Sequence, residues 1–218
     1  MPGCEVVHYP GWTTRAQRAN GGAGMVASGR LDDAIELHDG QLRLRPWRDD
    51  DVAQLVEAVQ ESADSVGRWL PWCHAGYGRD EAVAWVSHCR SGWRSGEHFA
   101  FPMFDASTGR LLGGVGLNQV EPLHRHANLG YWVRQSSQRQ GLAAVAGRRV
   151  ARFGFEQLGL IRIEIVVLPD NRPSRTTAEK IGATFESIAR NRLWVNEHAC
   201  DAAVYGLIPR DLARTRPG

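Results

Sequence analysis

The sequence lacks the features that mark membrane, secreted and metal-binding proteins. It has no apolar run near the roughly 18 residues of a membrane helix, and no charged N-terminal stretch followed by an apolar one. Its four cysteines, Cys4, Cys73, Cys89 and Cys200, are scattered and form no Cys-x-x-Cys pair. Neither a disulfide framework nor a zinc site is therefore predicted. We expect a cytoplasmic protein without a metal and without a membrane partner.

The chain also has little net charge. Its 26 Lys and Arg residues against 24 Asp and Glu leave a formal charge of +2, which gives no reason to expect a nucleic-acid partner. The 218 residues, 43% of them hydrophobic, suit one domain with a substantial core. Eight tryptophans are many for this length, and we expect several to line a pocket.

The most informative stretch of the chain is 128–160. Residues 128–134 are rich in strand formers, and a short polar turn follows. After the turn, apolar residues recur at helical spacing: Leu142, Ala146, Val150 and Phe153. A strand, a glycine-containing turn and a helix form an arrangement that binds pyrophosphate, because the free N–H groups at the helix start converge on the anion. The turn reads Gln138-Arg139-Gln140-Gly141-Leu142-Ala143.

Periodicity and turn residues predict a mixed α/β domain over residues 31–210. Asp39-Gly40 joins two alternating segments as a hairpin, and three acids at Asp49-Asp50-Asp51 open a helix. We expect 1–30 to be a flexible extension, with Met25 as an alternative start, and 211–218 to be a tail. The expected strands are 34–38, 41–45, 97–106, 110–120, 128–134, 161–168, 185–194 and 201–208, and further helices are expected at 79–93, after the polar turn and at 174–181.

Five motifs in this order resemble the GNAT N-acetyltransferases, and more narrowly their RimJ/RimL-type branch. Besides the polar turn, they are Leu42-Arg-Leu-Arg-Pro46, Leu129-Gly-Tyr-Trp-Val133, Asp170-Asn171-Arg-Pro-Ser174 followed by Glu179-Lys180-Ile-Gly182, and Asp201-Ala-Ala-Val-Tyr205. The resemblance covers about residues 34–208. It implies a mixed, mostly antiparallel sheet with helices on both faces, splayed at the parallel pair 128–134/161–168, with a bulge in the first strand of that pair.

The resemblance also implies acetyl-CoA as co-substrate and assigns residues to it. The pantetheine arm enters the splay and pairs with the exposed strand edge, where Trp132, Val133 and Arg134 supply backbone N–H groups. The pyrophosphate is held by Gln138, Arg139, Gln140, Gly141, Leu142 and Ala143. Asn171 hydrogen-bonds the arm near the sulfur. Relatives are often homodimers.

Two catalytic groups of the family are missing at their usual positions. Ala178 stands where many members have a tyrosine that protonates the thiolate, and the branch resemblance assigns this role to Ser174, which is equally suited to cap a helix. Asn128 stands where a glutamate base is common. Glu121, His124 and His126, in the loop before that strand, are the remaining base candidates.

The predicted function is transfer of an acetyl group to a primary amine, most simply a protein N-terminal α-amine. An α-amine, with a pKa near 8, is partly neutral at pH 7 and needs little help from a base. Trp69 and Trp72, which flank Pro71, are predicted to form the walls of the acceptor pocket. The alternatives are a small amine such as an aminoglycoside or polyamine, and a non-catalytic acyl-CoA-binding module.

Overall fold

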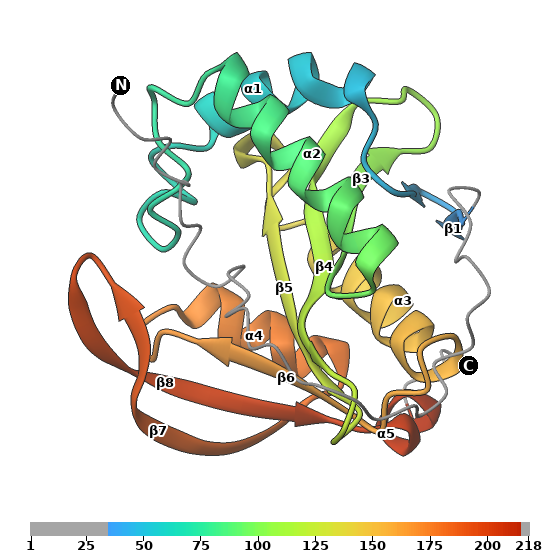
Figure 1. Ribbon diagram of the computed structural model, residues 1–218. Helices are drawn as coiled ribbons and strands as arrows, with labels where there is room; N and C mark the ends of the chain where they lie inside the picture. Colours follow the sequence, from blue (N-terminus) through green and yellow to red (C-terminus); the bar gives the residue numbers. More distant parts are fainter. Residues whose placement is uncertain (1–34, 215–218) are drawn as a thin grey trace.

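A computed structural model describes residues 35–214 as one mixed α/β domain built on an eight-stranded sheet (Figure 1). The predicted extension 1–30 lies outside the described residues, as do 31–34 and 215–218. The strand order is β1-β2-β3-β4-β5-β6-β8-β7, and every neighbouring pair is antiparallel except β5 and β6. The strands are β1 Leu37–Asp39, β2 Leu42–Leu44, β3 Phe99–Asp105, β4 Leu111–Glu121, β5 His126–Val133, β6 Arg162–Val167, β7 Thr184–Val195 and β8 His198–Leu207.

Helices cover both faces of the sheet, as predicted. Two 3-10 turns, η1 and η2, precede α1 and α3 respectively. In Figure 1, α1 and α2 lie in front of the central strands and α3 lies behind them. Within the described residues, no helix is both long and apolar enough to cross a membrane. The bounds are η1 Asp49–Asp51, α1 Val52–Glu61, α2 Arg79–Ser95, η2 Gln135–Ser137, α3 Leu142–Glu156, α4 Arg172–Ile181 and α5 Pro209–Arg214.

Strand alternation divides the core into two apolar clusters, one on each face of the sheet. Phe99 and Phe101 of β3 point toward α3 and pack around Phe153, with ring centroids 5.6 and 5.5 Å from it. Ala100, between them, belongs to the cluster under α1 and α2, together with Leu55 and Val86. This division matters for the site, because β5 presents different side chains to the two faces.

The C-terminal end of the domain differs from the prediction. The predicted tail begins at 211, but α5 runs through Arg214, and Leu212 is 6% exposed in the larger core cluster. The order of the last two strands was not predicted: β8 lies between β6 and β7, beside the parallel pair. A helix of six residues has too few turns to show a periodic pattern in the sequence.

One buried histidine makes stability depend on pH. His98, just before β3, is 1% exposed, and neither of its ring nitrogens has a partner of good hydrogen-bond geometry within residues 35–214. The ring of His88 from α2 stacks on it with centroids 4.3 Å apart. Burial lowers the pKa of His98 to about 4, and charge on His88 lowers it further. His98 is therefore neutral in the folded protein at neutral pH.

His98→Phe should flatten the loss of stability below pH 6.5. Between pH 6.5 and 4 an unfolded chain protonates this histidine and the folded protein does not, so the free energy of unfolding falls as the pH falls. The wild-type loss from this group is on the order of 2–3 kcal/mol. Urea unfolding at pH 7.5 and 4.5 measures it, with exposed His124→Phe as control. Equal pH dependence in both variants would contradict this assignment.

Candidate active site

The parallel strands β5 and β6 separate part way along their length. Their pairing covers His126↔Arg162 to Asn128↔Glu164 and then stops, although β5 continues to Val133 and β6 to Val167. The divergence lies where the sequence analysis expected a splay. The ladder of β4 and β5 is regular from Asn128 to Val133, so the predicted bulge in β5 is wrong. The irregularity lies in β4 after Asn118, where Gln119 adopts a φ of 50°.

Alternation along β5 decides which backbone groups face the gap. Arg134 donates its N–H to Leu112 O of the neighbouring chain segment at 2.8 Å, and alternation turns the N–H of Trp132 toward β4 as well. Of the three residues predicted to supply N–H groups, Val133 alone directs its N–H into the gap. For Trp132 and Arg134 the prediction is wrong, because a strand offers every second N–H to one side. Tyr131 presents the next N–H there.

The polar turn leaves a row of backbone donors free. Arg139 and Gly141 adopt left-handed conformations with φ of 64° and 77°, and α3 begins at Leu142. The N–H groups of 139–143 have no acceptor among the described residues, whereas Ala144 and Val145 already donate to Gly141 O. A Cβ on Gly141 would meet nothing within 4 Å. The turn therefore offers an open, donor-rich helix start of the kind that binds anions.

A single cleft of about 1320 Å³ joins these features. It contains the polar turn, the free edge of β5, the start of α4 and the segment 64–71 after α1. Four cationic side chains and one carboxylate line it: Arg68, Arg139, Lys180, Arg192 and Asp64. The cleft is thus suited to an anionic ligand.

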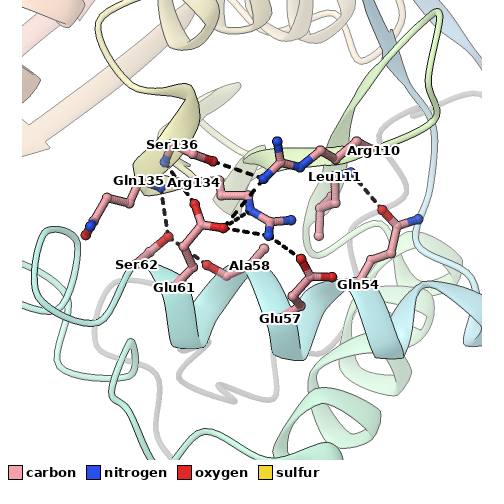
Figure 2. A network of polar contacts seen from close by, with 10 residues as sticks. All are labelled: Gln54, Glu57, Ala58, Glu61, Ser62, Arg110, Leu111, Arg134, Gln135 and Ser136. Atoms are coloured by element: carbon pink, nitrogen blue, oxygen red, sulfur yellow. Dashed lines mark hydrogen bonds and ion pairs between the residues drawn. The ribbon is translucent and has the colours of Figure 1, made fainter.

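The side chain of Arg134 anchors the polar turn to α1. It is 3% exposed, donates to Glu61 at 2.6 Å and also pairs with Glu57 (Figure 2). The guanidinium lowers the pKa of Glu61 to about 2. The other carboxylate oxygen of Glu61 accepts from Ser136 N–H of η2 at 2.9 Å. From the sequence, Arg134 was predicted only as a backbone donor, because its contacts with Glu57 and Glu61 join segments more than 70 residues apart.

Further hydrogen bonds connect the segment after α1 to the same turn. Gln135 N–H donates to Ser62 Oγ at 3.1 Å, and the side chain of Gln138 donates to Ser65 Oγ at 3.1 Å and to Val133 O at 3.2 Å. Gln138 therefore braces the turn against 62–65, with its amide engaged by protein groups. The end of α1 therefore fixes the position of the polar turn relative to the segment 62–65.

Ser174 and Tyr131 face each other across the gap. Ser174 Oγ donates to Tyr131 Oη at 3.2 Å, and Tyr131 Oη donates to the backbone oxygen of Ser174 at 2.8 Å. Burial raises the pKa of the Tyr131 phenol well above its usual value, so it stays protonated at neutral pH. The pair joins β5 to α4 across 43 residues of sequence, and no spacing rule would have revealed it.

Asn171, and not Ser174, caps α4. Its Oδ1 accepts from Ser174 N–H at 3.2 Å, which places Ser174 in the first turn of the helix with its hydroxyl free for another role. The suggestion that Ser174 is the cap is therefore wrong. The Nδ2 group of Asn171 remains available to a ligand, since the residue also lines the cleft.

The predicted base candidates lie outside the cleft. Glu121 and His126 sit at the far end of the β4–β5 hairpin, and neither they nor His124 belongs to the cleft lining. Glu121 accepts from Leu123 N–H at 3.0 Å and so shapes its own loop. None of the three therefore lines the cleft, and the identity of the base stays a prediction.

The two tryptophans predicted to form the acceptor pocket occupy different environments. Trp69 lines the cleft, with the guanidinium of Arg68 5.4 Å from its ring centroid. Trp72 packs against the core under α1 and α2 and meets Trp132 edge to face at 5.7 Å. Trp72 therefore supports the floor through Trp132 and does not line the cleft.

Comparisons with known proteins agree with this geometry. The model of the acetyltransferase (GNAT) domain matches residues 41–184. The chain is 27% identical over 164 residues to "Putative ribosomal N-acetyltransferase YdaF" of Bacillus subtilis (strain 168), covering 74% of this chain and 87% of that protein. A solved structure of a "putative ribosomal-protein-serine acetyltransferase" from Vibrio cholerae aligns with a TM-score of 0.74 at 31% identity, covering 82% of this chain and 100% of that one.

A further structure bears on the cleft. RimJ of Mycobacterium smegmatis, solved in complex with CoA-disulfide, aligns with a TM-score of 0.68 at 26% identity, over 78% of this chain and 83% of that one. The fold and the opened parallel pair thus define an enzyme of the N-acetyltransferase class. The chain belongs to the GNAT acetyltransferase family, and it is related to proteins named ribosomal-protein acetyltransferases.

Proposed function

We propose that the protein transfers the acetyl group of acetyl-CoA to the α-amino group of a protein N-terminus. The observation that carries this proposal is the single cleft that joins a donor-rich turn, an unpaired strand edge and a separate acceptor side. An elongated anionic thioester fits along the donor-rich turn and the unpaired strand edge. The amine approaches from the acceptor side, which is lined by the segment 64–71. The relatives named for ribosomal proteins support a protein substrate.

In this proposal the residues of the gap bind the donor. The N–H groups of 139–143 and the side chain of Arg139 hold the pyrophosphate, while Val133 and Tyr131 offer N–H groups to pantetheine and to the thioester oxygen. Asn171 Nδ2 hydrogen-bonds the arm. The neutral amine nitrogen attacks the carbonyl carbon, the C–S bond breaks, and the nitrogen gives up one proton to solvent. The leaving thiolate accepts a hydrogen bond from the Ser174–Tyr131 pair, takes up one proton from solvent and departs as the thiol.

The charge of the cleft separates the possible acceptors. A polycationic drug or polyamine would favour an acidic pocket, yet Asp64 is the one carboxylate against four cations in the lining of the described cleft. A protein N-terminus brings a single amine whose pKa near 8 leaves part of it neutral at pH 7. The charge balance therefore favours the N-terminus over the small polyamine.

Ser174→Ala and Tyr131→Phe should slow turnover without weakening the binding of acetyl-CoA. Each removes one hydroxyl near the leaving sulfur, and we expect kcat to fall by about 10- to 100-fold. Thiol detection of CoA release with an N-terminal peptide panel measures turnover, and calorimetry measures the affinity. Exposed Ser187→Ala on β7 is the control. Unchanged kcat in both variants would remove the pair from the mechanism, and binding without turnover by the wild type would favour a non-catalytic acyl-CoA-binding module.

A further inference from the structure

Two asparagines on the floor of the cleft have amides that are only partly satisfied. Asn118 of β4 and Asn128 of β5 lie opposite each other in the ladder, and Asn128 Nδ2 donates to Asn118 Oδ1 at 3.0 Å. The Nδ2 group of Asn118 and the Oδ1 atom of Asn128 are buried and have no hydrogen-bond partner among residues 35–214. Both residues line the cleft, so a ligand there is the natural partner of these atoms.

The pair offers one donor and one acceptor whichever way its amides are turned. A primary amide carries an oxygen and an NH₂ group, and one mutual hydrogen bond uses the oxygen of one residue and the NH₂ of the other. Reversing both amides exchanges the two residues' roles and leaves the same two functions free. Rotation about the last side-chain bond is soft, so both groups can turn toward a bound ligand.

The pair lies on the acceptor side of the gap. Along β5, Asn128 shares a face with Gly130 and Trp132, toward α1 and α2, whereas Tyr131 points to the opposite face. Asn128 is also the last residue of β5 that pairs with β6. The two amides therefore sit where the strand edge opens, in the cleft that segment 64–71 also lines.

We propose that the Asn118–Asn128 pair binds the first residue of the acceptor peptide, accepting a hydrogen bond from the α-amine and donating one to the first carbonyl oxygen. This inference rests on the proposed function and specifies its substrate. The α-nitrogen and the carbonyl carbon of a residue share one Cα, so the first residue of a peptide presents an amine and a carbonyl oxygen together, as the pair presents an acceptor and a donor together. A lysine side chain or a polyamine carries no carbonyl beside its amine.

Because the two asparagines carry no charge, they favour binding of an amine in its neutral form over an ammonium ion. An amide oxygen accepts an amine N–H without stabilising an ammonium ion as strongly as a carboxylate would. At pH 7.5 about a quarter or more of an α-amine of pKa near 8 is neutral, against about 0.1% of a lysine of pKa near 10.4. This difference alone gives a preference of roughly 200-fold for the N-terminus.

Peptide binding to the CoA-saturated enzyme tests the inference directly. Calorimetry compares wild type, Asn118→Leu and Asn128→Leu, with Gln157→Leu at the exposed end of α3 as the matched amide-to-leucine control. The probes are a short peptide with a free α-amine and an alkylamine of similar size without a carbonyl. We expect each asparagine variant to weaken peptide binding at least 10-fold and to leave CoA affinity unchanged. The variant that removes the donor to the carbonyl oxygen, whichever of the two it is, should leave alkylamine binding unchanged.

Equal losses for the peptide and the alkylamine in both asparagine variants, or no loss in either variant, would overturn the inference. Should leucine at 118 unfold the protein, Asn118→Ser provides the same comparison with a smaller side chain. A second readout is Asn128→Asp, which should narrow the rate preference for an α-amine over a lysine amine by at least 10-fold. Because binding is measured without turnover, a wild type that acetylates nothing would refute the proposed function and leave this binding test standing.

Discussion

Gly141→Glu should reduce the affinity for acetyl-CoA by at least about 100-fold while the protein stays folded. Gly141 precedes the first residue of α3 with φ of 77°, and a Cβ there points into open space at the mouth of the cleft. A glutamate would place a carboxylate beside the free N–H groups of 139–143, which in the proposed function bind the pyrophosphate. Both the steric block and the repulsion between like charges oppose binding.

The chain offers a close control for this substitution. Gly96, which ends α2, has φ of 74° and also has nothing within 4 Å of its Cβ position, but it lies outside the cleft. Gly96→Glu carries the same backbone strain, about 1–2 kcal/mol, so the two variants should lose similar stability. Calorimetric titration with acetyl-CoA should find binding lost in Gly141→Glu alone. Retained binding in that variant would refute the assignment of the turn to the pyrophosphate.

Local signals in the sequence were sufficient for most of the fold. Asp39-Gly40 predicted the hairpin of β1 and β2, and Gly40 adopts the positive φ of 45° that such a turn requires. Gly182 ends α4 with φ of 109°, as expected of a glycine after a helix. Both features depend only on neighbouring residues. The two strands at 128–134 and 161–168 were predicted from such local signals, whereas their parallel pairing followed from the family resemblance.

Contacts between distant segments could not be predicted in this way. Tyr131 and Ser174 meet because β5 and α4 converge at the gap, and Asn118 and Asn128 meet through the register of a hairpin. The base candidates show a related limit. Glu121 ends β4 and His126 begins β5, so both lie at the tip of this hairpin, outside the lining of the cleft, which their nearness to β5 in the sequence could not show.

The acids at the start of α1 show the same limit. Their position before the helix predicted a favourable interaction with the helix dipole, and this argument applies equally to all three acids. The structure distinguishes them, because Asp49 and Asp50 are exposed and Asp51 is 3% exposed. Asp51 receives two hydrogen bonds of 2.7 Å from the guanidinium of Arg45, which itself is 6% exposed. It also accepts from Arg48 N–H at 2.8 Å.

Asp51→Ala should therefore destabilise the protein by about 3–5 kcal/mol, because it leaves the charge of Arg45 buried without its partner. The remaining partners of Arg45 are Pro46 O at 3.0 Å and the face of Phe104, 4.5 Å from the guanidinium carbon, and neither neutralises the charge. Thermal unfolding should show a midpoint roughly 10 °C lower. Asp50→Ala, one residue earlier and exposed, should change the free energy of unfolding by less than about 0.5 kcal/mol.

A double variant separates the loss of attraction from the burial of a lone charge. Arg45→Met combined with Asp51→Leu removes both charges and fills their volume with apolar groups, so it should recover most of the stability that Asp51→Ala loses. Because α1 carries Glu61 and Ser62 to the polar turn, Asp51→Ala should also weaken acetyl-CoA binding near its unfolding midpoint. A double variant as unstable as the single one would show that the Arg48 cap, and not the ion pair, is what Asp51 supplies.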